Sequence, residues 1–255
     1  MEVHHHPHLD SDGHRRKSFK EYFLEFLMIF LAVTMGFIAE NLREKIADHN
    51  KEKEYVESLI QDLKTDTTLS NDIIEGITAQ TYGMDTIEMV LTPSINKSDS
   101  AVFICYRQGK SLSNQHVMNY SSRTITQLFS SGNMRLIKEQ AVSDSITQYY
   151  SNVNGVNAQK DYYVDYFHKC LEIYQQIYEF GSYRTTIDAH DELVSSSGGY
   201  GKNHIAVTDS ATLARFKATI EFTKQIARSY RTDIRRQKAA ATSLCAFLKE
   251  KYDLQ

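Results

Sequence analysis

Residues 22–39 read YFLEFLMIFLAVTMGFIA, and this run decides what kind of protein the sequence describes. Glu25 is its only charged residue, and most of the others are Phe, Leu, Ile or Val. At about 1.5 Å per residue, a helix of this length reaches about 27 Å, close to the roughly 30 Å of a membrane's hydrocarbon core. Each large apolar residue favours insertion by about 0.3 to 0.6 kcal/mol, whereas an acid costs at most about 3 kcal/mol. The sequence therefore predicts a transmembrane anchor helix over residues 18–41.

Two other interpretations of the apolar run are open. Residues 26–39 could form the buried core helix of a soluble protein, or the run could belong to a signal peptide. No small-x-small cleavage site follows the run, which favours an uncleaved signal anchor. Arg15, Arg16 and Lys17 form a compact basic cluster before the run, whereas later basic residues are spread among acids. We therefore expect a single-pass protein of the inner membrane, with its N-terminus in the cytoplasm and its C-terminal domain in the periplasm.

The sequence after the anchor favours long helices. Pro7 and Pro93 are the only two prolines in the 255 residues, so a first helix can continue from the anchor into a stalk and end before Pro93. The stalk positions that alternate at steps of four and three, the a/d pattern of a coiled coil or bundle, are Leu42, Ile46, His49, Lys53, Val56, Ile60 and Leu63. The stripe then shifts to Leu69, Ile73 and Ile77.

Two further stretches carry the same alternation and predict two more long helices. In residues 137–180 the a/d positions are Val142, Ile146, Tyr149, Val153, Val156, Lys160, Tyr163, Phe167, Cys170, Tyr174 and Ile177. Near the C-terminus they are Leu213, Phe216, Ile220, Thr223, Ala227, Tyr230, Ile234, Gln237, Ala241, Leu244 and Leu248. Asp209 or Ser210 is placed to cap the last helix. We expect Ala227 and Ala241 to face bulky aromatic residues of the middle helix.

The connecting segments are less regular. Residues 114–129 favour one or two short helices, whereas the apolar run 101–106 has no strand partner and is expected to be a packed extended segment. The turn cluster at residues 130–133, SSGN, predicts a corner between helices at Gly132, with an anion site at the next helix start as the alternative. The fold prediction is all-α: a transmembrane helix continuous with a long stalk helix, packed into an elongated antiparallel helical bundle over residues 42–255.

Composition and motifs argue against several functional classes. The net charge is -3, with 29 basic and 32 acidic side chains, so nucleic acid is not an expected partner. No nucleophile elbow, zincin, EF-hand or dinucleotide-binding motif occurs, and the sequence around Lys202 fails the P-loop pattern at two positions. The widely spaced Cys105, Cys170 and Cys245 favour buried thiols over a zinc or disulfide framework. We expect no enzyme, no catalytic residues, no cofactor and no metal site.

Four weaker candidates for binding are present in the sequence. Residues 1–17 are expected to form a disordered, His-rich cytoplasmic tail, with metal binding as the alternative. His190 lies among acids in residues 188–192, an arrangement typical of a solvated loop. Seven tyrosines between Tyr149 and Tyr178 favour burial in the bundle, with a partner interface as the alternative. A basic band, favoured as a solvated or salt-bridged face over a site for an anionic ligand, contains Arg228, Arg231, Arg235, Arg236 and Lys238.

Two motifs carry a family resemblance: EYVESLIQDLKTD at residues 54–66 and TITQLFSSGNMRLIKEQAVSDSITQYY at residues 124–150. Together with Glu25 in the anchor, they make the chain resemble a family of bacterial single-span membrane proteins of unknown function. The matching motif residues are Glu54, Tyr55, Leu59, Asp62, Leu63, Asp66, Leu128, Ser131, Gly132, Leu136, Ile137, Ile146, Tyr149 and Tyr150. The Phe-rich anchor and the loop 181–208 depart from the family pattern. The resemblance implies one span and an extracytoplasmic helical domain, and no activity.

The functional expectation follows from topology more than from chemistry. We expect a noncatalytic, membrane-anchored helical scaffold or protein-interaction module. Its expected partners are the lipid bilayer and either further copies of the chain or another membrane protein. The alternative is an extracytoplasmic ligand sensor or accessory subunit that relays through the anchor helix to a membrane partner.

Overall fold

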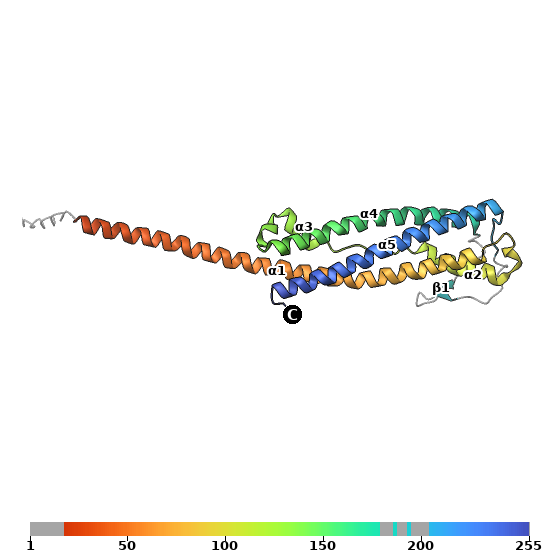
Figure 1. The fold of residues 1–255 in the computed structure, drawn as a ribbon, viewed down its shortest axis with the longest axis horizontal. Helices are drawn as coiled ribbons and strands as arrows, with labels where there is room; N and C mark the ends of the chain where they lie inside the picture. The colour runs from red at the N-terminus through yellow and green to blue at the C-terminus, as the bar shows by residue number, and fades with distance from the viewer. Residues whose placement is uncertain (1–17, 179–185, 188–192, 195–203, 255) are drawn as a thin grey trace, which may run out of the picture. The chain divides into compact units, whose positions relative to one another are not determined.

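The protein is all-α, as predicted, in a computed structural model that describes residues 18–178, 186–187, 193–194 and 204–254 (Figure 1). Its long helices are α1 (Phe19–Val90), α4 (Gln140–Ile177) and α5 (Ser210–Lys251). Shorter helices are α2 (Asp99–Gly109) and α3 (Arg123–Ser130), with 3-10 turns η1 (Ile95–Lys97), η2 (Lys110–Ser113) and η3 (Asn133–Leu136). The strands β1 (Thr186–Ile187) and β2 (Leu193–Val194) form one antiparallel pair of two residues each.

The chain divides into two compact units, residues 1–52 and residues 53–255. In the first unit, the apolar run of α1 has no buried side chain; Phe26 is 63% exposed and Phe30 is 54% exposed. This helix is the one in the described chain that is long and apolar enough to cross a membrane, a criterion of length and composition alone.

In the second unit, α1 supplies one wall of the bundle. Val56, Ile60 and Leu63 are buried, as their a/d positions predict. Beyond them the predicted shift of the stripe is correct at Ile77, which is buried, and wrong at Leu69, whose side chain is 42% exposed. From Leu63 the buried positions follow at steps of three and then four, so the second position of each heptad lies one residue earlier than the stalk pattern predicts. The buried residues include polar ones and are Asp66, Ser70, Ile77, Gln80, Met84, Ile87 and Leu91.

Helices α4 and α5 form a hairpin that completes the bundle. Every predicted a/d position of both helices is buried except Lys160, which is half-buried. Figure 1 shows α5 antiparallel to α1 and α4, while α1 and α4 run in the same direction. Helices α1 and α4 can run in the same direction because residues 114–122 lead the chain back along α1. Two hydrogen bonds hold this segment on α1: the Asn114 carbonyl accepts from Gln80, and the Ser121 amide donates to Asp66.

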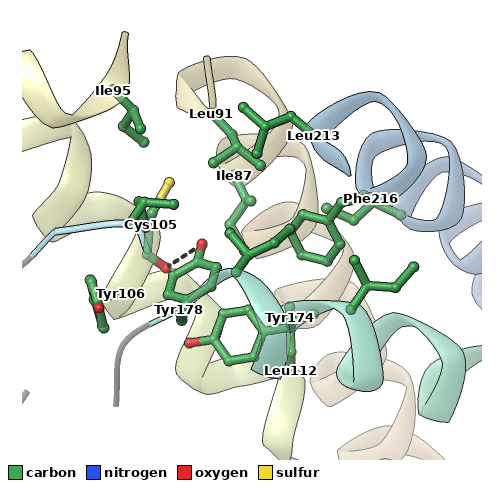
Figure 2. Close-up of a cluster of buried hydrophobic side chains, with 14 of the residues drawn as sticks. Ile87, Leu91, Ile95, Cys105, Tyr106, Leu112, Tyr174, Tyr178, Leu213 and Phe216 are labelled. Carbon is green, nitrogen blue, oxygen red and sulfur yellow. Dashed lines mark hydrogen bonds between the residues drawn. The ribbon is translucent and has the colours of Figure 1, made fainter. Parts of the chain in front are cut away.

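The core consists of three clusters along the bundle. Figure 2 shows the cluster where the ends of α1, α2, α4 and α5 meet, in which Tyr178 donates a hydrogen bond of 3.4 Å to the Cys105 carbonyl. The middle cluster contains Ala227 and Tyr163, and the third cluster contains Ala241 and Tyr149. Small residues of α5 therefore lie in the same clusters as aromatic residues of α4.

The connectors confirm two predictions and correct one. Asp209 caps α5, because its Oδ1 accepts from the Thr212 amide at 2.9 Å. Gly132 adopts φ 67°, a left-handed conformation that glycine favours, between α3 and η3. The run 101–106 is not extended: it lies in α2, because residues spaced three and four apart, such as Val102 and Tyr106, bury one helical face.

Substitution by alanine is expected to have opposite effects on stability at two glycines. A Cβ added at Gly109 would lie 2.3 Å from the buried Tyr174 hydroxyl, whereas one at Gly155, inside α4, would meet no atom within 4 Å. We expect Gly109→Ala to lower the free energy of unfolding by about 1 to 3 kcal/mol through overpacking. The matched control Gly155→Ala should raise it by about 0.5 to 1 kcal/mol. Urea unfolding of the full chain in detergent micelles measures both, and equal effects would contradict the packing at Gly109.

Candidate functional site

The motifs at residues 54–66 and 124–150 meet inside the bundle. Asp66 on α1 accepts a hydrogen bond of 2.8 Å from the Ser121 amide at Oδ1 and one of 3.2 Å from the Tyr149 hydroxyl at Oδ2. One turn earlier, Asp62 accepts from the Thr124 amide at 3.4 Å. Both aspartates are buried. These carboxylates therefore fasten the returning segment before α3, and α4 as well, to α1.

Two more tyrosines complete this group, which we call the carboxylate–tyrosine cluster and define as Asp62, Asp66, Tyr120, Tyr149 and Tyr150. The hydroxyl oxygens of Tyr120 and Tyr150 are buried without a hydrogen-bond partner in the described part of the chain. The ring of Tyr150 packs edge-on against Tyr149, with centroids 5.0 Å apart. A buried hydroxyl without a hydrogen-bond partner lowers the stability of the fold. The two tyrosine hydroxyls therefore make this part of the core less stable than a fully hydrogen-bonded core would be.

Burial controls the ionisation of the cluster. Desolvation raises the pKa of the Asp66 carboxyl, although the hydrogen bonds from Ser121 and Tyr149 oppose that shift. Desolvation, reinforced by the nearby aspartates, also raises the pKa values of the Tyr120, Tyr149 and Tyr150 hydroxyls. The tyrosines thus stay protonated at neutral pH and act as hydrogen-bond donors, not as bases.

The raised pKa of Asp66 predicts a pH effect on stability. Folding favours the protonated carboxyl, so the stabilisation is complete below the unfolded pKa, about 3.9, and is lost as pH rises through the folded pKa. Asp66→Asn keeps an acceptor and cannot ionise. The difference in free energy of unfolding between Asp66→Asn and the wild type should therefore shift in favour of the variant as pH rises above about 4. At higher pH, above the folded pKa of Asp66, this difference should become constant. Urea unfolding across pH measures this difference, and parallel profiles would contradict the assignment.

An open groove of about 840 Å³ adjoins the carboxylate–tyrosine cluster, between residues 119–130 and α4. Tyr120, Ser121 and Tyr150 belong to its wall. The other lining residues are Asn119, Ser122, Ile125, Thr126, Phe129, Ser130, Thr147, Ser151, Val153, Asn154, Asn157 and Lys160. Hydroxyl and carboxamide groups dominate, with one cation and no carboxylate. Such a lining can hydrogen-bond a polar ligand but supplies no acid–base pair.

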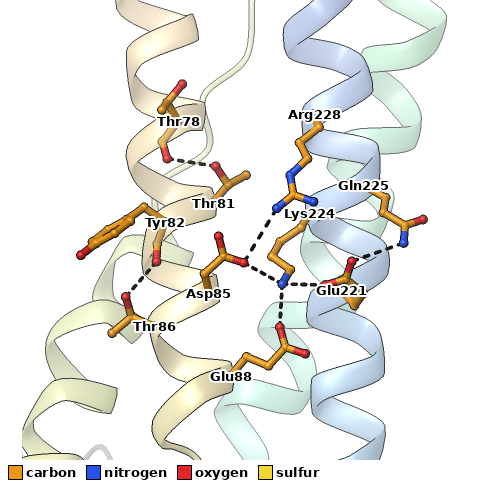
Figure 3. A network of polar contacts seen from close by, with 10 residues as sticks. All are labelled: Thr78, Thr81, Tyr82, Asp85, Thr86, Glu88, Glu221, Lys224, Gln225 and Arg228. Atoms are coloured by element: carbon orange, nitrogen blue, oxygen red, sulfur yellow. Dashed lines mark hydrogen bonds and ion pairs between the residues drawn. The ribbon is translucent and has the colours of Figure 1, made fainter.

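A second polar group, shown in Figure 3, joins α1 to α5. The buried Lys224 ammonium lies 2.7 Å from Asp85, 2.6 Å from Glu88 and 2.6 Å from Glu221. Burial opposes its charge, but these hydrogen bonds hold the pKa of Lys224 above its ordinary value. Because three carboxylates use the three donors of the ammonium, Lys224 is a structural cross-link and has no donor left for a substrate.

Several sequence candidates are not brought into either polar group. The His-rich tail 1–17, residues 188–192 and Lys202 lie outside the described residues. Within the described ranges, no group of three or more His, Cys, Asp or Glu side chains could hold a metal ion. Cys105 and Cys170 are buried free thiols whose pKa values burial raises, to about 11 and about 12. They pack as small apolar residues.

Sequence reasoning missed the burial of the two aspartates. Within residues 54–66, the heptad pattern assigns only apolar positions to the core. The signal was present, because Asp66 and Ser70 stand in the same a/d register as Leu63 and Ile77. Comparisons with known proteins add no further assignment: no family profile, curated protein or solved structure matches the chain.

Proposed function

We propose that the chain is a noncatalytic, membrane-anchored helical interaction module. The observation that carries the proposal is the exposure of apolar heptad positions of α1 that precede residue 53. Leu42 is 58% exposed and Ile46 is 54% exposed. They precede the buried Val56 and Ile60 by 14 residues, which is two heptads, so they continue the same a/d register. A helix from another copy or from a membrane partner can cover them in the way the bundle covers the later positions.

The anchor is part of the same proposal. Residues 18–41 cross the bilayer, with the N-terminus in the cytoplasm and the helical domain in the periplasm. A cysteine introduced at Ser11, in a Cys245→Ser background, should resist an impermeant thiol reagent in intact cells; the other two cysteines are buried. Labelling at position 11 before permeabilisation would reverse the orientation.

Photo-crosslinking in native membranes tests the interaction. A photoreactive amino acid at position 42 or 46 should give a crosslinked product that affinity purification recovers, either a dimer of the chain or an adduct with a membrane protein. Position 44 is the control, because it lies about 200° around the helix from position 42. Recovery of uncrosslinked chain from every position would contradict the proposal.

The polar groove favours a second candidate function, an extracytoplasmic ligand sensor or accessory subunit. Its wall shares Tyr120 and Tyr150 with the carboxylate–tyrosine cluster, and the amide of its Ser121 donates to Asp66 of that cluster on α1. A ligand in the groove could therefore act on the helix that continues into the anchor. A metabolite screen should then yield a compound that raises the Tm of the wild type but not of Asn154→Trp. Equal shifts in both proteins would place the compound elsewhere.

A further inference from the structure

A second groove, between α1 and α5 and separate from the polar groove on α4, is lined by positively charged side chains. Its volume is about 580 Å³. Its lining residues are Asn71, Ile74, Arg235, Lys238, Ala239, Thr242 and Ser243. Arg231 lies one turn away on the same face of α5, and its Nη1 donates to the Thr78 hydroxyl at 2.8 Å. Three cationic side chains of the basic band therefore face one narrow strip of α1.

These three cations lack the acidic partners that their neighbours have. In the described part of the chain, no carboxylate oxygen lies within 4.0 Å of Arg231, Arg235 or Lys238. By contrast, Arg228 lies 3.9 Å from Asp85. The same holds on the other side of α5, where Arg236 lies 3.4 Å from Asp233. The acids of α1 nearest in sequence to this groove, Asp72 and Glu75, are exposed and form no ion pair with the three cations.

The groups are also partly fixed in place. The Nε of Arg231 is buried and has no hydrogen-bond partner among the described residues. Lys238 donates to the Asn71 side-chain oxygen at 2.5 Å, which holds its ammonium at the groove. Desolvation lowers the pKa of Arg231, and the like charges of Arg235 and Arg228 add to that effect. An anion placed here would relieve that repulsion.

We propose that this groove binds a phosphate-type oxyanion. Arg235 in the lining supplies planar donors that match a phosphate group, Lys238 supplies a second charge, and the hydroxyls of Thr242 and Ser243 are available as further donors. Arg231, one turn along α5 from Arg235, adds a third positive charge beside the groove. The ligand is either a free phosphate compound or the phosphate of a lipid headgroup. The site is separate from the polar groove on α4 and does not depend on the proposed interaction of the stalk.

Titration of the full chain in neutral detergent with inorganic phosphate and with pyrophosphate, at constant ionic strength, tests the site. Calorimetry should show saturable binding by the wild type. Arg231→Gln and Arg235→Gln should each weaken it by about tenfold or more, equal to about 1.4 kcal/mol. Arg236→Gln is the matched control, because that side chain is already paired with Asp233, and it should bind as the wild type does. Circular dichroism confirms that each variant is folded.

A second arm separates the two sources of phosphate. The same proteins are transferred into mixed micelles that contain phosphatidylglycerol, and the Tm is compared with that in neutral micelles. A rise in Tm that needs Arg231 and Arg235, without binding of the soluble anions, assigns the site to a headgroup. Binding of the soluble anions assigns it to a free phosphate compound. The absence of both effects, or an equal loss in Arg236→Gln, would overturn the proposal.

Discussion

Replacing Phe30 and Leu31 together by arginine should release the protein from the membrane. Both side chains lie near the middle of the apolar run, and both are exposed in the structure. At the centre of a span, arginine costs about 2.5 to 3.5 kcal/mol, and a large apolar residue favours insertion by about 0.3 to 0.6 kcal/mol. The double substitution therefore costs about 6 to 8 kcal/mol, which is larger than the effect of one central acid.

Membrane fractionation after an alkaline carbonate wash measures this effect. The wild type should stay in the membrane pellet, and the double variant should move to the supernatant or be degraded. Two arginines at Leu42 and Ile46 are the control, because these positions lie beyond the predicted span. The control should stay in the pellet. Retention of the Phe30→Arg, Leu31→Arg variant would mean that α1 does not anchor the protein.

Truncation of Tyr163 should cause the largest loss of stability in the bundle. Its side chain is fully buried, its ring stacks on Tyr230 with centroids 5.2 Å apart, and its hydroxyl donates to Gln80 at 2.6 Å. Tyr163→Ala removes the ring from the middle of the core and leaves a cavity. Large aromatic truncations of this kind cost about 3 to 5 kcal/mol.

The neighbouring tyrosine provides the control for that measurement. Tyr162 precedes Tyr163 in the same helix but is 64% exposed, so Tyr162→Ala should change the free energy of unfolding by less than about 0.5 kcal/mol. Urea unfolding of both variants in the same detergent gives the comparison. A similar loss of stability in the two variants would contradict the assignment of Tyr163 to the buried face of α4 and of Tyr162 to its exposed face.

Much of the fold could be predicted from the sequence because its helices follow simple rules. The heptad positions of α4 and α5, such as Phe167 and Ile220, alternate without interruption, and burial follows them. The N-cap at Asp209 and the left-handed turn at Gly132 were also visible, because each depends on one residue with a strong local preference.

The rest depended on partners that are distant in the sequence. Asp66 is buried because the Ser121 amide and the Tyr149 hydroxyl satisfy it, and neither partner can be located from residues 54–66 alone. Lys224 is buried for the same reason, through Asp85 and Glu88 on another helix. A polar residue at a heptad position indicates either exposure or a buried partner, and only the fold decides between them.

The mass of the protein in native membrane discs tests the central claim most directly. Membranes are solubilised with a polymer that keeps the lipid, without any crosslinker, and the protein mass of each purified particle is measured. A membrane-anchored interaction module predicts particles that contain at least two chains of 29.3 kDa or one chain with a membrane partner. Glutamate at both Leu42 and Ile46 should reduce these to single chains. Particles with one chain alone from the wild type would contradict the account.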